Sequence, residues 1–286
     1  MRARRHLLPL ILAALAGGAG RLRAAGDSLV ETRLKNIVEQ QRTVLADAAA
    51  QRDRGSLDDK EFRMHVEQIC HEYESLLQDS PKFAAGYASY GYLLWRVGMR
   101  KEAAAILLKA NEIDPDIALV KNELGNYLAE EGKPLDAVSY FLSAIKLEPK
   151  EPLYHYQLGM LLYEARDDFI RSGEWTRDSV DHAMHEAFRH AAELAPGRVE
   201  FSYRYAESFY DLDSPDWDEA FKAWAKLEAG AQSDLERQTM RLHEANVSLK
   251  QGRPDRAREI LATVTAPELQ GQKQKLAAGM AGSGAK

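Results

Sequence analysis

The sequence has a single cysteine, Cys70, among its 286 residues, and this limits how the fold can be stabilised. No intrachain disulfide can form, so side-chain packing must stabilise the structure. Cys70 falls on the apolar side of a predicted helix, where a small buried hydrophobic role is expected. A nucleophilic thiolate beside His71 is the alternative. It is disfavoured because adjacent helical residues point about 100° apart.

Catalytic motifs and long apolar runs are also missing from the sequence. No phosphate-binding glycine loop, nucleophile elbow or dinucleotide fingerprint is present, so we expect no enzyme activity, no catalytic residue and no cofactor. The apolar run Leu7 to Ala16 is too short to span a membrane. His182 and His185 have a spacing that would suit a metal pair, but no Cys pair or further histidine spacing completes a site. Solvated histidines and no metal are therefore expected.

The distribution of charge argues against two classes of partner. The formal net charge is −6, and Arg2, Arg4, Arg5, Arg21 and Arg23 all lie in the segment 1–26, so the remainder of the chain carries −11. An acidic body disfavours nucleic acid and anionic lipid as partners.

The amino-terminal segment has the three-part layout of an export signal. Arg2, Arg4 and Arg5 precede the apolar run, and the small residues 17–20 follow it. We therefore expect a signal peptide over residues 1–26 and a periplasmic or secreted protein. A disordered basic tail is the alternative, because Pro9 interrupts the apolar run and the cleavage site is ambiguous.

Glycine and proline recur along the chain at one constant interval. The recurring residues are Gly91, Gly125 and Gly159, together with Pro81, Pro115 and Pro149. Small residues are needed where paired helices approach closely, and proline cannot continue a helix. Gly98 and Gly132 fall where the first helix of each pair should end in a left-handed conformation.

These residues resemble the tetratricopeptide repeat, and the resemblance covers approximately residues 63–262. It implies an all-α fold, a right-handed superhelical solenoid of antiparallel helix pairs. We expect N-terminal capping helices with a degenerate repeat over residues 27–80. An array of about five repeats is expected over residues 81–265, and a flexible tail over residues 266–286. An insertion at residues 166–180 either carries binding residues or extends the two helices beside it.

In such an array the first helix of each pair lines the concave face, where a partner would bind. Aligning the repeats by their glycines places eleven candidate partner-binding side chains there: Tyr92, Trp95, Arg96, Asn122, Asn126, Glu130, Tyr156, Tyr163, Tyr203, Arg204 and Tyr210. Aromatic rings and amides suit an extended or helical peptide. The alternative for these aromatic residues is packing between repeats.

The predicted function is therefore a protein–protein interaction scaffold that binds a peptide or protein partner on the concave surface. The alternative is a structural or assembly component of a cell-envelope or self-associating complex, and the sequence leaves the oligomeric state open. Chaperone-binding members of the family hold a terminal carboxylate with Lys, Arg and Asn. Asn126 matches one such position, but Ala88 and Leu153 stand at the Lys positions.

Overall fold

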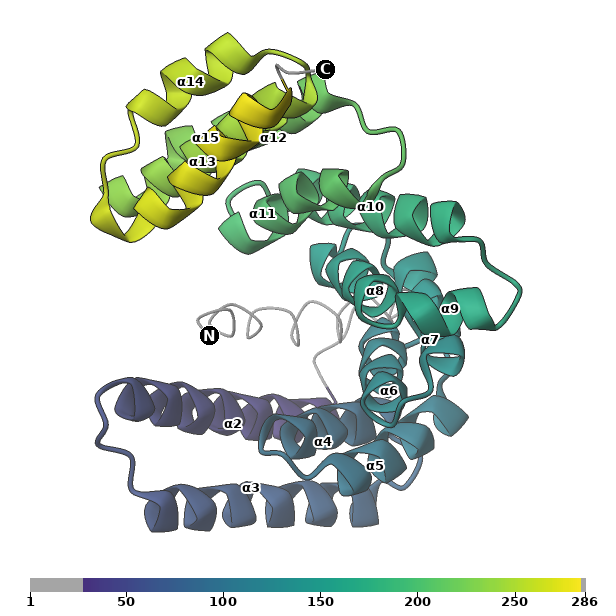
Figure 1. Cartoon of the computed structure of the whole chain (residues 1–286). Coiled ribbons are helices and arrows are strands. Elements are labelled where there is room, and N and C mark those ends of the chain that lie inside the picture. Colours follow the sequence, from purple (N-terminus) through teal and green to yellow (C-terminus); the bar gives the residue numbers. More distant parts are fainter. Residues whose placement is uncertain (1–27, 284–286) are drawn as a thin grey trace. The chain divides into compact units, whose positions relative to one another are not determined.

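The computed structural model describes residues 28–283, and this part of the chain consists of helices and their connections without a strand (Figure 1). The predicted signal peptide lies outside the described residues. The chain divides between Pro149 and Lys150 into two compact units, called unit 1 and unit 2 here. The predicted fold class, all-α with antiparallel helix pairs, is confirmed for the described residues.

The described part of unit 1 is built from hairpins of consecutive helices. They are α2 (Leu29–Asp53), α3 (Asp59–Asp79), α4 (Ala84–Arg96), α5 (Arg100–Ile113), α6 (Ala118–Glu130) and α7 (Pro134–Leu147). Helix α2 packs on α3, α4 on α5, and α6 on α7, and α5 and α6 join successive hairpins. The N-terminal pair forms the helices expected upstream of the repeats.

Close approach of the paired helices explains the repeating glycines. A Cβ atom added at Gly91 would lie 2.6 Å from Cγ of Leu107, and one at Gly125 would lie 3.0 Å from Cε1 of Phe141. Gly98 and Gly132 end the first helices with φ of +89° and +71°, a region that favours glycine. The packing and capping roles predicted for these residues are therefore confirmed.

Unit 2 continues the pattern with more irregular pairs. Its helices are α8 (Pro152–Glu164), α9 (Arg166–Arg171), α10 (Arg177–Leu194), α11 (Val199–Ser208), η1 (Phe209–Asp211), α12 (Trp217–Gly230), α13 (Asp234–Lys250), α14 (Pro254–Ala262), η2 (Pro267–Leu269) and α15 (Gln270–Ser283). Helix α8 pairs with α10, α11 with α12, and α13 with α14.

The insertion at residues 166–180 forms α9, a turn and the start of α10. Phe169 of α9 is fully buried, and its ring packs edge-on against Trp175. Arg166 Nε lies 2.6 Å from Oδ1 of the buried Asp181, and its Nη2 lies 3.0 Å from Oδ1 of Asp211. The aromatic contact thus lies inside the insertion, and the ion pairs of Arg166 join the insertion to Asp181 of α10 and Asp211 of η1.

The sequence predicts a flexible tail over residues 266–286, of which the structure describes residues 266–283. The structure places η2 and α15 in this segment, and Leu269 and Leu276 pack into a cluster that includes Leu242 of α13. The buried Gln238 of α13 accepts hydrogen bonds from the backbone N–H groups of residues 265 and 266, at 2.6 and 2.8 Å. Long-range contacts therefore order a segment whose own sequence has little periodicity.

The described helices include none that is both long enough and apolar enough to cross a membrane.

Candidate functional site

Six of the predicted partner-binding residues lie on α4 and α6 of unit 1, two first helices that contact each other. Arg96 Nη1 donates a hydrogen bond to the Tyr92 hydroxyl over 2.9 Å. Arg100 at the start of α5 connects the two helices. Its guanidinium carbon lies 3.9 Å from the centroid of the Trp95 ring, and its Nε lies 3.2 Å from Glu130 Oε2.

A buried carboxylate, Glu123, lies at the centre of this group. Its two oxygens accept hydrogen bonds from Nδ2 of Asn122 and Nδ2 of Asn126, each at 3.2 Å. Glu123 is 5% exposed. Burial raises the pKa of its carboxyl group to about 7, against the opposing effect of the two amides and of Arg96 and Arg100. We call Tyr92, Arg96, Asn122, Glu123 and Asn126 the Glu123 cluster.

Sequence reasoning missed Glu123, although a signal was present. The residue directly precedes Leu124, which belongs to the packing row of the repeat, and it lies between two predicted contact residues, Asn122 and Asn126. An acidic residue in that register is placed between neighbouring first helices, where hydrogen-bonding partners must offset the cost of its burial.

Two of the predicted contact residues in unit 1 are not accessible to a partner. Tyr92 is 4% exposed and Asn122 is 0% exposed, so neither side chain is available to a ligand. Both make hydrogen bonds inside the cluster instead. Burial also raises the pKa of the Tyr92 hydroxyl. Trp95, Arg96 and Asn126 are half-buried and Glu130 is exposed, so these four remain available at the surface.

In unit 2 the predicted residue Tyr156 packs between repeats. Its ring stacks on Phe201 at 4.6 Å and lies 5.8 Å from Phe188, and its hydroxyl donates to Glu200 over 3.0 Å. This is the alternative role that the sequence left open for the aromatic residues.

Tyr163 is the most accessible aromatic residue of the predicted set, at 41% exposure. The guanidinium carbon of Arg204 lies 4.3 Å from its ring centroid, and Arg204 also pairs with Glu207. The structure therefore brings the predicted residues Tyr163 and Arg204 together as a cation–π pair at the surface of unit 2.

Tyr203 and Tyr210 surround His243 of α13, which sequence reasoning did not single out. The His243 ring stacks on Trp224 with centroids 3.8 Å apart and planes 6° apart. The Tyr203 hydroxyl lies 3.3 Å from His243 Nε2, and the Tyr210 hydroxyl lies 3.5 Å from Nδ1. Burial lowers the pKa of His243 to about 4, so this aromatic cluster holds a neutral imidazole at physiological pH.

Of the two histidines considered as a metal pair, His182 is exposed as predicted, but the prediction of a solvated side chain is wrong for His185. His185 is buried, and its Nδ1 lies 2.9 Å from the Ser208 hydroxyl, whereas the exposed His182 lies 3.2 Å from an Asp178 carboxylate oxygen. Residues 28–283 contain no group of three or more His, Cys, Asp or Glu side chains that could hold a metal ion.

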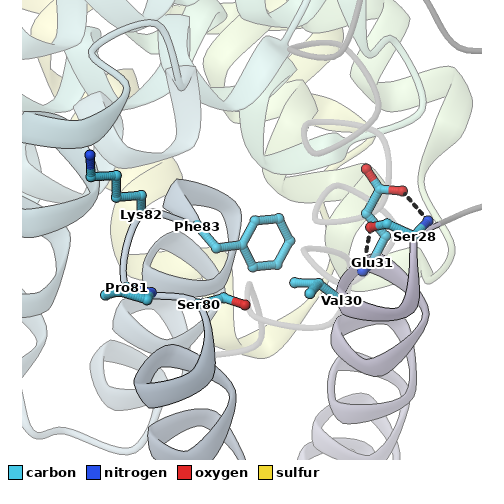
Figure 2. Close-up of a pocket in the computed structure, with 7 residues that line it drawn as sticks. All are labelled: Ser28, Val30, Glu31, Ser80, Pro81, Lys82 and Phe83. Carbon is cyan, nitrogen blue, oxygen red and sulfur yellow. Dashed lines mark hydrogen bonds between the residues drawn. The ribbon is translucent and has the colours of Figure 1, made fainter.

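An open pocket of about 500 Å³ lies in unit 1 beside the start of α2. Figure 2 shows Val30 and Phe83 pointing toward each other across it, next to the hydrogen-bonded pair Ser28 and Glu31 that caps α2. None of the predicted partner-binding residues lines this pocket. Its mainly apolar wall offers no charged cluster comparable to that around Glu123.

The sequence profile of the tetratricopeptide repeat matches residues 84–117, which form the hairpin of α4 and α5. The chain has a tetratricopeptide-repeat fold. No curated protein matches the chain at a significant level.

Solved tetratricopeptide-repeat and related structures show the same fold at low sequence identity. YrrB, described as a TPR protein with an unusual peptide-binding site, is 17% identical with a TM-score of 0.55, over 67% of this chain and 90% of its own. PilF of Pseudomonas aeruginosa is 16% identical with a TM-score of 0.53, over 85% of this chain and 99% of its own. PilW, described as a type IV pilus biogenesis factor, is 13% identical with a TM-score of 0.53, over 86% of this chain and 99% of its own.

The repeat pattern identifies which helices carry the Glu123 cluster. The matched repeat supplies α4 as its first helix, and α6 is the corresponding first helix of the next hairpin, with Gly125 where α4 has Gly91. The cluster therefore lies between the first helices of two consecutive hairpins, the first of which is the matched repeat.

Proposed function

We propose that this protein is a non-enzymatic interaction scaffold that binds a peptide or protein partner through the face formed by α4 and α6. The observation that carries this proposal is the accessibility of Trp95, Arg96, Asn126 and Glu130 on two adjacent first helices. An indole ring supplies contact area at low entropic cost, and the amide supplies a hydrogen-bonding group for a peptide backbone. The description of YrrB as having a peptide-binding site supports the same class of partner.

Site-specific photo-crosslinking in living cells tests the proposal. A photoreactive amino acid at Trp95 is expected to give discrete protein adducts. The matched control is the exposed Lys109 on α5, a second helix of the same unit. Adducts at Lys109 that equal those at Trp95 would argue against a partner on the face of α4 and α6.

An assembly role is the second candidate, and a different surface favours it. Leu108 on α5 is 47% exposed and Leu142 on α7 is 50% exposed, and the two occupy the same register in the second helices of successive hairpins. Large apolar side chains repeated on one side of an array are typical of a contact surface. Sedimentation velocity distinguishes the roles, because the scaffold role predicts a monomer. The assembly role predicts an oligomer that dissociates in the Leu108→Glu, Leu142→Glu double variant.

We propose further that the chain is exported, with residues 1–26 as the signal peptide. The basic, apolar and small-residue segments of the sequence support this localisation. Expression with a C-terminal tag should give mature protein in the periplasm or medium, with a mass that lacks the leader. Full-length protein confined to the cytoplasm would contradict export.

A further inference from the structure

The Glu123 cluster holds a carboxyl group in a place that favours its neutral form. Glu123 is only 5% exposed, where α4 meets α6. The two guanidinium groups that act on it by charge are bonded elsewhere. Arg96 donates to the Tyr92 hydroxyl over 2.9 Å, and Arg100 donates to the Trp95 carbonyl over 2.7 Å. A buried carboxyl group without an ion pair is more stable when it carries its proton.

The titratable and charged groups that face Glu123 come from three helices. Tyr92 and Arg96 belong to α4 and Arg100 to α5, and Glu130 of α6 pairs with Arg100. The Tyr92 hydroxyl is neutral at physiological pH, because burial raises its pKa. Burial also outweighs both arginines at Glu123 and raises the pKa of its carboxyl group to about 7. The charge of Glu123 therefore changes near neutral pH.

The two amides of the cluster fit both charge states of this carboxyl group. Nδ2 of Asn122 donates to Oε1 of Glu123 and Nδ2 of Asn126 donates to Oε2, each over 3.2 Å, which suits an ionised carboxylate. Oδ1 of Asn122 is buried without a hydrogen-bond partner in the described structure. A half-turn of this amide exchanges its oxygen and nitrogen, so that Oδ1 accepts the proton of a neutral carboxyl group at Oε1. The Asn126 bond remains, because a neutral carboxyl group keeps one carbonyl oxygen as an acceptor.

We propose that Glu123 and Asn122 form a proton-dependent switch in the face formed by α4 and α6. With the proton bound, the Glu123 hydroxyl donates to the turned Asn122 amide and α6 stays packed against α4. When the proton leaves, the buried negative charge favours openings of the α4–α6 contact that give the carboxylate access to water. The switch regulates the proposed partner-binding function and rests on it for what the face binds. The free chain carries the switch itself, so its test needs no partner.

Hydrogen exchange of the full chain at pH 6 and pH 8, corrected for the intrinsic pH dependence of exchange, measures the opening. A carboxyl group whose pKa is about 7 in the closed contact and 4.5 in the open one makes opening about tenfold more frequent at pH 8 than at pH 6. Exchange in α4 and α6 should rise by this factor in the wild type, with α2 of the same unit unchanged as the reference. In Glu123→Gln, which carries no charge at either pH, exchange in α4 and α6 should be equal at both.

The side-chain amide of Asn122 gives a second readout, because a residue that only fills space would not follow the proton. Its nitrogen NMR signal should shift between pH 6 and pH 8 in the wild type and should not depend on pH in Glu123→Gln. Glu244→Gln is the matched control. Glu244 is also 5% exposed with a pKa raised to about 7, but it lies on α13 in unit 2. This variant should leave both readouts in unit 1 unchanged.

An Asn122 amide signal that stays constant from pH 6 to pH 8 in the wild type would overturn the switch. Equal pH dependence of exchange in the wild type and Glu123→Gln would overturn it too. If Glu123→Gln does not fold, titration of the Asn122 signal in the wild type and in Glu244→Gln still decides. Crosslinking at Trp95 tests the partner-binding function separately: adducts without the pH effect contradict only the switch, and the pH effect without adducts contradicts only the partner-binding function.

Discussion

At the scale of single residues, the glycines in the first helices are the most confined of the described glycines. A Cβ atom at Gly159 would lie 2.6 Å from Cε1 of Phe188, a fully buried ring, whereas a Cβ atom at Gly125 would lie 3.0 Å from Phe141. In an open helix, Gly→Ala stabilises by up to about 1 kcal/mol. The steric overlap must exceed this gain before such a substitution destabilises the protein.

We predict that Gly159→Ala lowers the free energy of unfolding by about 1 to 3 kcal/mol and that Gly125→Ala lowers it less. Gly271→Ala in α15 is the control, because an added Cβ there meets nothing within 4 Å. Urea denaturation followed by circular dichroism measures all three. Equal stabilities for Gly159→Ala and Gly271→Ala would show that the helix register of unit 2 is wrong.

Glu123 links stability to pH. Its pKa rises from 4.5 in the unfolded chain to about 7 in the fold, so the folded state binds the proton more tightly. Its contribution is therefore fully present below pH 4.5 and is lost as pH rises through 7. We predict a loss on the order of 2 to 3 kcal/mol between pH 4.5 and 8 from this residue. In Glu123→Gln this part of the pH dependence should disappear.

Two other groups, Glu244 and His243, also contribute to the pH dependence of the free energy of unfolding. Their contributions are the same in the wild type and in Glu123→Gln. Glu244, whose pKa is also raised to about 7 by burial, acts in the same direction as Glu123 and remains in the Gln variant. His243 acts in the opposite direction, because its lowered pKa removes stability as pH falls from 6.5 toward 4. Denaturation series at several pH values measure the profile. An unchanged slope above pH 5 in Glu123→Gln would contradict the prediction for Glu123.

At the scale of helices, the hairpins could be predicted from local sequence signals. Features that depend on contacts between distant parts of the sequence could not. The glycine and proline spacing reports contacts inside one hairpin, such as Gly125 against Phe141, so the sequence indicates them directly. Burial of Asn122 depends instead on the neighbouring hairpin, which a helical pattern alone does not describe. The order of α15 likewise depends on Gln238, 27 residues before the first backbone group that it holds.

We predict that Gln238→Ala releases α15 from the end of unit 2. The substitution removes the acceptor for two backbone N–H groups and leaves them unpaired, at a cost of about 1 to 3 kcal/mol. Hydrogen exchange in residues 264–279 should accelerate by roughly tenfold or more, since about 1.4 kcal/mol corresponds to tenfold.

Gln232→Ala is the control for this measurement, because the exposed Gln232 side chain donates to the Gly230 carbonyl and makes no hydrogen bond to α15 in the described structure. Its backbone N–H, which the substitution keeps, donates to Glu236. Exchange in α15 should not change in this variant. Retained protection of α15 in Gln238→Ala would mean that the apolar contacts of Leu269 and Leu276 suffice to hold the segment.

At the scale of the whole molecule, contacts between helices follow the order of the chain. The helix pairs with the most extensive contacts, α4 with α5, α6 with α7, α8 with α10 and α12 with α13, are neighbours in the sequence or nearly so. The stability of such an array is approximately a sum over repeats and their nearest-neighbour interfaces. A local defect should therefore raise local opening without unfolding distant repeats.

We predict that Gly91→Leu, which drives a side chain into Leu107, accelerates hydrogen exchange throughout α4 to α6 by about tenfold or more in the full-length protein. Exchange in α12 to α14 should stay within roughly twofold of the wild type, because each repeat of an array is stabilised mainly by its nearest neighbours. Gly159→Leu is the reciprocal variant and should give the reverse pattern, with α8 and α10 affected and α4 unchanged. Uniform acceleration in both variants would instead require units 1 and 2 to unfold as one cooperative body. The proposed partner-binding face would then be coupled to unit 2, and substitutions at Gly159 would weaken capture at Trp95 as strongly as those at Gly91.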